Sequence, residues 1–448
     1  MTSGPNDPDS SLASRRQVRL AAIASVVGTS IEWYDYFLYG TAAAIVFPAV
    51  FFPSSSSYSG TLASFATYAV GFAARPVGAA IFGHWGDRLG RKATLIVTLL
   101  MMGIGSALVG CLPGTDTIGI AAPILLVIFR IFQGIAIGGE WSGSVLLSME
   151  TGKQRRRGLM ASWPQVGVPI GLLLGTGMMT AIALGDPAAF KAWAWRIPFL
   201  FSLVLVAIGL WVRLKVMETP LFSRIVAEQK VAKVPVGEVI KKHPKEILLS
   251  AFLRMSEQAP FYVYTTFALA YMKNHLGQTE GLALGAISIG GALELFCTPF
   301  FGNLSDRVGR RRLYVTGAAF MAVIAFPVFL LINTRNAGLI ILGILLIALA
   351  HSIQYGPQAA YIAESFPTRL GYAGSGLGYQ TASLIAGGPA PLLATWMLAN
   401  FGWQAISVYI IACAVLTLTA AAMLPDRRHA NLIQLPETAA TASPLANT

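Results

Sequence analysis

Two short stretches decide the fold: GHWGDRLGRK at residues 83–92 and GNLSDRVGRR at residues 302–311. Each has a Gly, an Asp-Arg pair and a second Gly followed by two basic residues, and the copies are 219 residues apart. An offset of nearly half the 448-residue chain predicts two duplicated halves. The glycines permit tight turns and close helix packing, while the Asp can pair with Arg or cap a helix start.

The composition around these motifs is that of a membrane protein. Hydrophobic residues make up 55% of the chain and charged residues only 12%, about half the charged share of a globular domain. So few charges cannot cover a water-exposed surface of this size, which excludes soluble enzymes, disordered chains and fibrous proteins. The net charge of +12 lies in short segments between apolar runs, which favours contact with a lipid bilayer over nucleic acid.

Twelve apolar segments are long enough to cross a hydrocarbon core of ~30 Å as tilted helices, which predicts an all-α polytopic membrane protein. We place them at 20–43, 60–83, 93–112, 119–141, 159–184, 196–214, 246–272, 282–302, 313–333, 338–361, 373–398 and 403–424. One long polar stretch separates the first six from the last six, and we expect it to carry amphipathic helices at the membrane surface. The predicted domains are a tail at 1–19, a six-helix bundle at 20–214, a linker at 215–245, a six-helix bundle at 246–424 and a tail at 425–448.

The distribution of basic residues predicts the orientation of these helices. Counted with the N-terminus inside, 25 of the 32 Lys and Arg residues lie on the cytoplasmic side, 4 on the opposite side and 3 within spans. This bias places both termini in the cytoplasm of a plasma membrane protein, and a bacterial inner membrane suits it. The N-terminal tail is predicted to be disordered and to lead into an uncleaved first helix. The three cysteines lie in apolar runs, which argues against disulfides or a metal site.

The paired motifs resemble those of the major facilitator superfamily over essentially the whole chain. The resemblance implies two six-helix bundles around a central cavity that work by alternating access. Four further stretches resemble the metabolite:proton symporter branch, which includes permeases for shikimate, 2-oxoglutarate, citrate and proline or betaine: EWYDYFLYG at 32–40, RPVG at 75–78, RIFQGIAIGGEW at 130–141 and WRIPFL at 195–200. The stretches most similar to the shikimate permease group are LRMSE at 253–257, AHS at 350–352 and GSGLGYQTAS at 374–383.

Ionisable residues inside the predicted spans are costly to bury and are therefore functional candidates. Glu32 and Asp35 share one helix face, where their mutual repulsion favours proton uptake by one of them. Arg254 and Glu257 have the spacing of an ion pair. Five acids against three arginines leave acids without an Arg partner, which suits proton coupling. The alternative for any single residue is static pairing that locks helices together.

The candidate roles follow from depth and chemistry. For proton coupling we name Glu32, Asp35, Glu257 and Glu294. For substrate binding we name Arg75, Arg130, Gln133, Arg254, His351, Tyr355 and Gln380, with helix packing as the alternative for each polar residue. For a cytoplasmic gate we name Asp87, Arg88, Arg91, Glu140, Asp306, Arg307 and Arg310, and we expect Glu140 to engage the Arg88/Arg91 loop.

These features predict a monomeric secondary transporter that takes up a small organic acid, such as shikimate or a di- or tricarboxylate, together with protons. A guanidinium group grips a carboxylate through two hydrogen bonds, which is why the buried arginines indicate an acid. The alternatives are symport of a zwitterion such as proline or betaine, or export of a drug. No nucleophile–base pair, metal-ligand set or cofactor motif is present in the sequence, so we expect neither an enzyme nor a cofactor besides the proton gradient.

Overall fold

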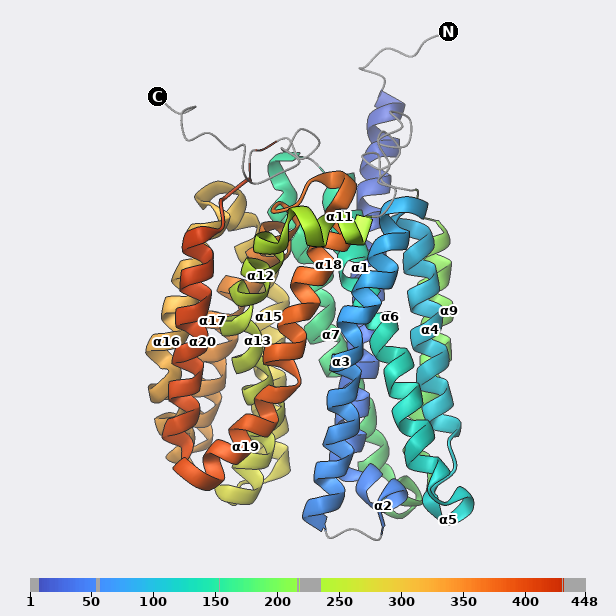
Figure 1. Cartoon of the computed structure of the whole chain (residues 1–448). Helices are drawn as coiled ribbons and strands as arrows, with labels where there is room; N and C mark the ends of the chain where they lie inside the picture. The colour runs from blue at the N-terminus through green and yellow to red at the C-terminus, as the bar shows by residue number, and fades with distance from the viewer. Residues whose placement is uncertain are drawn as a thin grey trace.

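The computed structural model describes residues 8–53, 57–152, 154–215, 217, 235–428 and 430, and every regular element in these ranges is a helix. Twelve membrane-crossing segments pack into two bundles of six that lie side by side (Figure 1). The predicted all-α fold with two pseudo-symmetric bundles is confirmed. Short helices connect the crossings: α2 (Phe47–Phe51), α5 (Thr115–Ile118), η1 (Gln154–Arg156), α8 (Pro187–Ala189), η2 (Phe190–Ala194) and α11 (Pro235–Lys242).

Each bundle is built from long helices in which apolar side chains face outward and small residues allow close packing. The first bundle contains α1 (Pro8–Ile45), α3 (Ser57–Leu89), α4 (Arg91–Cys111), α6 (Ala121–Thr151), α7 (Arg157–Gly185) and α9 (Arg196–Leu214). In the second bundle the unbroken helices are α15 (Glu280–Val308), α16 (Arg310–Asn333), α17 (Ala337–Ala363) and α20 (Trp403–Met423).

The remaining two crossings of the second bundle are assembled from short pieces. The seventh runs through α12 (Pro244–Leu253), α13 (Met255–Tyr262), η3 (Val263–Phe267), α14 (Ala268–Ala270) and η4 (Tyr271–His275). The eleventh runs through η5 (Thr368–Leu370), α18 (Gly371–Ala382), η6 (Ser383–Gly387) and α19 (Pro389–Phe401). The segments η3, η4 and η6 are π-helical, a geometry that often occurs at functional sites.

Ten helices in the described part of the chain are long and apolar enough to cross a membrane by length and composition alone. The other two crossings are α1 and the seventh. Both carry charged pairs, Glu32 with Asp35 and Arg254 with Glu257, and the seventh crossing is also interrupted at Arg254. The polar residues that weaken the membrane signal of these helices are therefore the ones that we single out as functional candidates.

Two local expectations are wrong. The duplicated motif is not a loop, because α3 continues to Leu89 and α15 to Val308, and the next helix starts after a single glycine. Gly90 and Gly309 turn the chain there with φ of 109° and 114°, values that favour glycine. The N-terminal tail is helical from Pro8, because no glycine or further proline stops α1 from extending outward.

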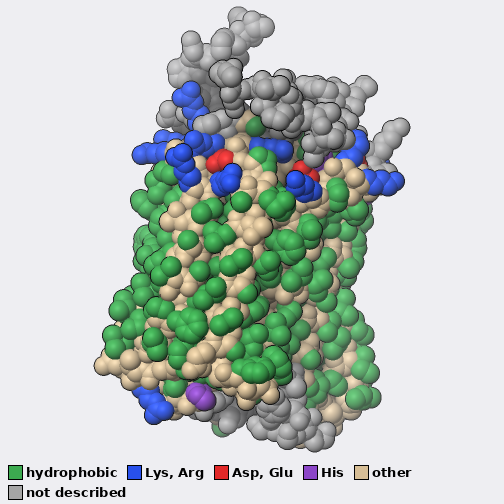
Figure 2. Space-filling view, turned by 60° about the vertical axis from the view of Figure 1, so that its left-hand side comes forward, with side chains coloured by type: hydrophobic (Ala, Val, Ile, Leu, Met, Phe, Trp, Pro, Cys, Tyr) green, Lys and Arg blue, Asp and Glu red, His purple; other side chains and the backbone are tan. Residues whose placement is uncertain are grey.

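Charged side chains gather at one end of the molecule, which we call the basic end. It is the end at which Gly90 and Gly309 connect their helices and α20 finishes. Figure 2 shows Lys and Arg clustered along this end, above a broad band of hydrophobic side chains that covers the middle of the face in view. This distribution is that of a multi-pass membrane protein.

The described end of the predicted linker folds onto the second bundle. Glu238 of α11 forms ion pairs with Lys242 and with Arg369 of η5. Burial alone would raise the pKa of Glu238, but the hydrogen bonds from Lys242 and Arg369 together outweigh it and lower the pKa. Residues 218–234 of the linker and 431–448 of the C-terminal tail lie outside the described residues.

Candidate functional site

At the basic end, the Asp of the first motif caps a helix of the other bundle. Asp87 Oδ1 accepts a hydrogen bond from the backbone N–H of Tyr372 (3.1 Å), and Oδ2 accepts one from Ala373 (2.9 Å). Both N–H groups lie in the first turn of α18, where the helix leaves its amides unpaired and its dipole favours negative charge. Gly83 allows this contact, because a Cβ there would lie 2.7 Å from Ala373 Cα.

The second motif makes the same contact in the opposite direction. Asp306 accepts hydrogen bonds from the backbone N–H groups of Gly158 (2.8 Å) and Leu159 (3.0 Å), which open α7 in the first bundle. Gly302 allows this contact as Gly83 allows the first, because a Cβ at Gly302 would lie 2.5 Å from Ser162 Cβ. The two copies therefore join the bundles through two equivalent caps.

An arginine of each motif ties its Asp to a second acid. Arg91 Nη2 lies 3.7 Å from Asp87 and 3.4 Å from Glu150. Arg310 Nη2 likewise lies 2.8 Å from Asp306 and 3.1 Å from Glu364. The other motif arginines are exposed: Arg88 contacts His84 (3.2 Å), while the backbone carbonyl of Arg307 accepts a hydrogen bond from Arg428 (3.0 Å).

Glu140 has a different partner from the one expected. Its carboxylate forms an ion pair with Arg213 in the last turn of α9 and accepts hydrogen bonds from Thr98 (2.9 Å) and Ser144 (3.0 Å). Arg213 is not singled out in the sequence, where it lies at the end of the predicted span 196–214, but its side chain is buried. No local signal reveals this pairing, because it depends on how α6 and α9 rotate against each other.

The bundles also meet at mid-depth through aromatic rings. Trp33 of α1 lies edge-on to Phe261 of α13, with ring centroids 6.0 Å apart. Tyr262 lies 5.9 Å from Tyr36 and 5.5 Å from Phe72 by the same measure. Beside these rings is a small central cavity, lined by Trp33, Val168, Arg254, Glu257, Gln258, Phe261, Tyr262, His351, Tyr355 and Tyr379.

A chain of ionisable groups begins at one wall of the central cavity and ends at Glu294 behind it. Arg254 Nε lies 3.3 Å from Glu257 Oε2, which confirms the expected ion pair. Glu257 Oε1 lies 3.4 Å from His351 Nε2, and His351 Nδ1 lies 2.8 Å from Glu294 Oε1. Arg254 also donates to the carbonyl of Tyr379 (2.7 Å) and stacks on its ring. The structure thus brings together four predicted residues from α13, α15, α17 and the turn that precedes α13.

A polar chain connects this wall to the first bundle. Gln358 donates to Glu257 Oε2 (2.6 Å), and Gln165 of α7 donates to Gln358 Oε1 (3.3 Å). Trp141 in turn donates to Gln165 (2.9 Å) and stacks on Tyr379, with ring centroids 3.6 Å apart. We did not predict Gln165, Gln358 or Tyr379 from the sequence, because a Gln or Tyr in a span usually serves helix packing.

The acids of α1 lie in different surroundings from Glu257. Asp35 is 2% exposed and its Oδ1 accepts a hydrogen bond from Ser202 of α9 (2.5 Å). Glu32 is 3% exposed and lies near Arg75, Glu140 and Arg213. Within the described residues, one carboxylate oxygen of each acid is buried without a hydrogen-bond partner.

Arg75 and Arg130, the substrate-binding candidates of the first bundle, lie among aromatic rings outside the lining of the central cavity. The Arg130 guanidinium is 4.2 Å from the centroid of the Tyr39 ring and donates to Gln133 (3.3 Å). The Arg75 guanidinium is 4.3 Å from the centroid of the Phe72 ring. Gln380 likewise lies outside that lining and donates to the Ile137 carbonyl across the bundles (3.5 Å).

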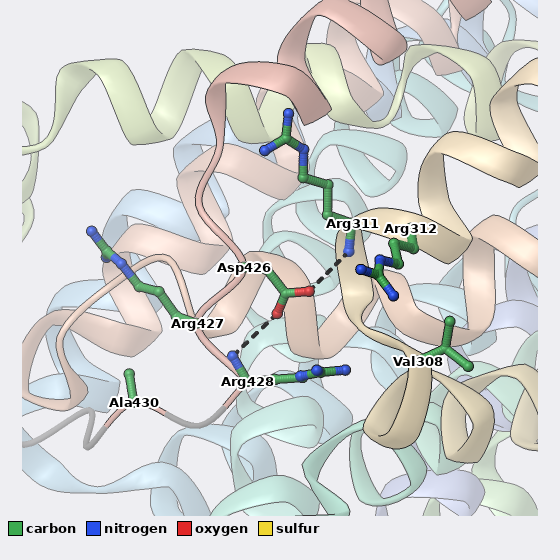
Figure 3. Close-up of a pocket in the computed structure, with 7 residues that line it drawn as sticks. All are labelled: Val308, Arg311, Arg312, Asp426, Arg427, Arg428 and Ala430. Atoms are coloured by element: carbon green, nitrogen blue, oxygen red, sulfur yellow. Dashed lines mark hydrogen bonds between the residues drawn. The ribbon is translucent and has the colours of Figure 1, made fainter. Parts of the chain in front are cut away.

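A surface hollow at the basic end is rich in arginine. It is lined by Val308, Arg311, Arg312, Asp426, Arg427, Arg428 and Ala430. Figure 3 shows Asp426 at its centre, accepting hydrogen bonds from the backbone N–H groups of Arg311 and Arg428, while the Arg311 and Arg427 side chains point away from it. Diverging guanidinium groups do not form a fork around one anion, which leaves the central cavity as the better candidate site.

Two pseudo-symmetric bundles, capped onto each other at one end and enclosing a charged cavity at mid-depth, define a membrane transporter. Residues 35–391 match the family model of the Major Facilitator Superfamily. The chain belongs to this superfamily and is therefore a transporter, not an enzyme.

Individual relatives agree with this assignment. The chain is 41% identical to the shikimate transporter of Escherichia coli K12 over 94% of its own length and 98% of that protein. It is 35% identical to the proline/betaine transporter of the same organism, over 85% of this chain and 78% of that one. Among solved structures, a proton:xylose symporter superposes with a TM-score of 0.75 at 19% identity, covering 92% of this chain and 97% of that chain. The resemblance to the shikimate permease group is confirmed.

Proposed function

We propose that this protein takes up a small organic acid, such as shikimate or a di- or tricarboxylate, together with protons by alternating access. One observation carries the proposal: the arginine that lines the central cavity, Arg254, is neutralised by an acid of the same wall, Glu257. A substrate carboxylate that binds Arg254 has to displace Glu257, which leaves a buried negative charge without its partner. Proton uptake on this wall removes that cost, so anion and proton bind together.

The lining of the central cavity bears on the rival substrates. The quaternary ammonium group of betaine would require an aromatic cage. Five aromatic residues line the central cavity, Trp33, Phe261, Tyr262, Tyr355 and Tyr379, so the competition experiment below has to separate betaine from an acid.

The remaining assignments are part of the same proposal. Glu32, Asp35, Glu257 and Glu294 take part in proton coupling, and the Asp87 and Asp306 contacts close the basic end. By the excess of Lys and Arg, that end faces the cytoplasm of the plasma membrane. The transporter works as a monomer, with the linker joining two bundles that rock against each other.

Uptake by reconstituted protein tests the proposal. Vesicles containing the protein are expected to accumulate labelled shikimate or 2-oxoglutarate when an inward proton gradient is imposed, and a protonophore should abolish this accumulation. Asp35→Asn and Glu257→Gln should each reduce accumulation by at least about tenfold, because each removes a proton-binding group. Asp116→Asn is the matched control, since Asp116 is an exposed acid of α5.

Two outcomes would contradict this proposal. Uptake that is indifferent to the protonophore rules out proton coupling, and wild-type accumulation by both Asp35→Asn and Glu257→Gln rules out the residue assignment. Competition separates the substrates: unlabelled proline or betaine that blocks uptake better than shikimate or 2-oxoglutarate would favour the zwitterion alternative.

A further inference from the structure

His351 of α17 lies between two carboxylates from two other helices. Its Nδ1 is 2.8 Å from Glu294 of α15, and its Nε2 is 3.4 Å from Glu257 of α13. The ring is held between Phe261 and Tyr355, whose ring centroids lie 4.9 and 4.7 Å from its own. This stacking fixes the ring plane, so that each nitrogen faces one acid.

The same imidazole separates two cavities. His351 and Glu257 line the central cavity. His351 and Glu294 line a second small space, the side cavity, which is bounded by α7, α13, α15, α17 and η3. The rest of the side cavity lining is mostly apolar, formed by Leu172, Phe261, Tyr264, Thr265, Ile287, Gly290, Gly291, Ile344, Ile347 and Ala348. Glu294 therefore contacts a space that is distinct from the central cavity, and His351 contacts both.

Glu257 has a basic side chain beside each of its oxygens. Its Oε2 faces Arg254 at 3.3 Å, and its Oε1 faces His351 at 3.4 Å. One carboxylate neutralises only one full charge, so a protonated His351 competes with Arg254 for Glu257. In the described part of the chain, the other titratable groups around this network are Tyr262 of α13, Tyr264 of η3, Cys297 of α15, Tyr314 of α16, Tyr355 of α17 and Tyr379 of α18, and none of them is a carboxylate.

We propose that Glu294 passes a proton from the side cavity to His351, and that the imidazolium then replaces Arg254 as the partner of Glu257. In this step the O–H bond of protonated Glu294 breaks, its electron pair stays on the carboxylate, and an N–H bond forms at His351 Nδ1. The proton on Nε2 faces Glu257. Arg254 is thereby released to bind the carboxylate of the substrate. The reverse transfer, from Nδ1 to Glu294, lets Glu257 reclaim Arg254 and expel the substrate.

This arrangement couples the two solutes without a shared binding site. The proton is held between Glu294 and His351, while the substrate binds Arg254 in the central cavity. The bound proton and the bound substrate both favour the state in which Glu257 pairs with His351. Proton binding must therefore strengthen substrate binding, and substrate binding must strengthen proton binding by the same factor. The inference rests on the proposed function, because it requires that the central cavity binds a carboxylate.

Equilibrium binding tests the coupling apart from transport. Labelled shikimate, whose carboxylate stays ionised, is bound to the purified protein in nanodiscs from about pH 5.5 to about pH 8.5, a range that brackets the titration of histidine. Above its midpoint, wild-type affinity should fall about tenfold per pH unit, the slope for one coupled proton. His351→Asn should bind with little pH dependence. Glu294→Gln should shift the midpoint to more acidic pH, because the imidazolium loses one of its two carboxylates.

His275→Asn is the matched control, because His275 lies in η4 at the opposite end of its crossing from Arg254 and should keep the wild-type pH profile. A wild-type pH profile in both His351→Asn and Glu294→Gln would overturn the inference. If His351→Asn does not fold, the pH profile of Glu294→Gln alone tests the inference, since this variant retains the imidazole of His351. If wild-type protein binds none of shikimate, 2-oxoglutarate and citrate at any pH, the proposed function itself fails, which is a different result from binding without coupling.

Discussion

The contact between Glu140 and Arg213 shows what a single buried pair does for the first bundle. Both side chains are almost fully buried, and they join α6 to α9 close to the acid Glu32. A buried charge that loses its partner costs far more than the intact pair contributes. The pair therefore holds two helices in place. Arg213 also offsets the repulsion between the carboxylates of Glu140 and Glu32.

Removing one partner of this pair should destabilise the protein. Arg213→Gln leaves the Glu140 carboxylate buried without its cation, at a cost of about 3–5 kcal/mol, so the melting temperature in detergent should fall by several degrees. The double variant Arg213→Gln with Glu140→Gln should recover part of the loss, because no charge is left unpaired. A melting temperature for Arg213→Gln equal to that of the wild type would contradict this account.

Residue identities were easier to predict from the sequence than residue partners. Glu257, His351 and Glu294 were identified because ionisable groups are rare inside apolar runs, and the spacing of Arg254 and Glu257 revealed their contact. The contacts of His351 with two acids depend on the relative rotation of three helices, which hydropathy does not encode. Arg213 was missed for a similar reason: at the end of a span, a buried arginine and a loop arginine look alike.

At the scale of elements, glycines determine how closely helices of different bundles approach. The twelve spans were predictable because hydropathy is a local property, and the predicted boundaries lie within a few residues of most helix ends. The extension of α3 and α15 through the motif was not, because a Gly-rich charged stretch normally indicates a loop. In both helices the first glycine of the motif, Gly83 or Gly302, allows a contact between bundles, and the last, Gly90 or Gly309, follows the end of the helix.

Filling one of these contacts should force the basic end open. In Gly302→Val the new side chain meets Ser162 and the Gly158 carbonyl of α7. Overpacking costs ~1–3 kcal/mol, so the ratio of closed to open protein should fall by about 5- to 150-fold. The measurement is the alkylation rate of a cysteine placed at Val168, in a protein without its native cysteines, by an impermeant maleimide applied to the basic-end side.

Gly285→Val is the control on the same helix, because a Cβ at Gly285 meets nothing within 4 Å in the described structure. It should leave the alkylation rate at Val168→Cys unchanged. Equal rates for Gly302→Val and Gly285→Val would mean that the Gly302 contact does not hold the basic end closed.

At the scale of the whole molecule, closure of the basic end depends on two equivalent caps. Asp87→Asn and Asp306→Asn each remove the charge that a helix N-terminus favours, at a cost of about 0.5–2 kcal/mol per cap. Each variant should therefore raise the alkylation rate at Val168→Cys from the basic-end side. Because the two caps are separate, the double variant should show the product of the two increases.

Comparison of the single variants checks the pseudo-symmetry directly. If only one of the two substitutions changes the alkylation rate, the caps are not equivalent and closure depends on one bundle's motif. Vesicles of opposite orientation add a second control, since the effect should appear only when the reagent reaches the basic end.

The reciprocal caps also bear on how such a chain can arise. Asp87 binds the start of α18, and Asp306 binds the start of α7. The two acids occupy equivalent positions in the two halves, and so do the two helix starts. Contacts in which site i binds site j while j binds i are those of an isologous interface between identical subunits. A single six-helix half that carried both the Asp and the helix start would therefore be self-complementary. Fusion of two such halves preserves an ancestral two-fold dimer interface within one polypeptide.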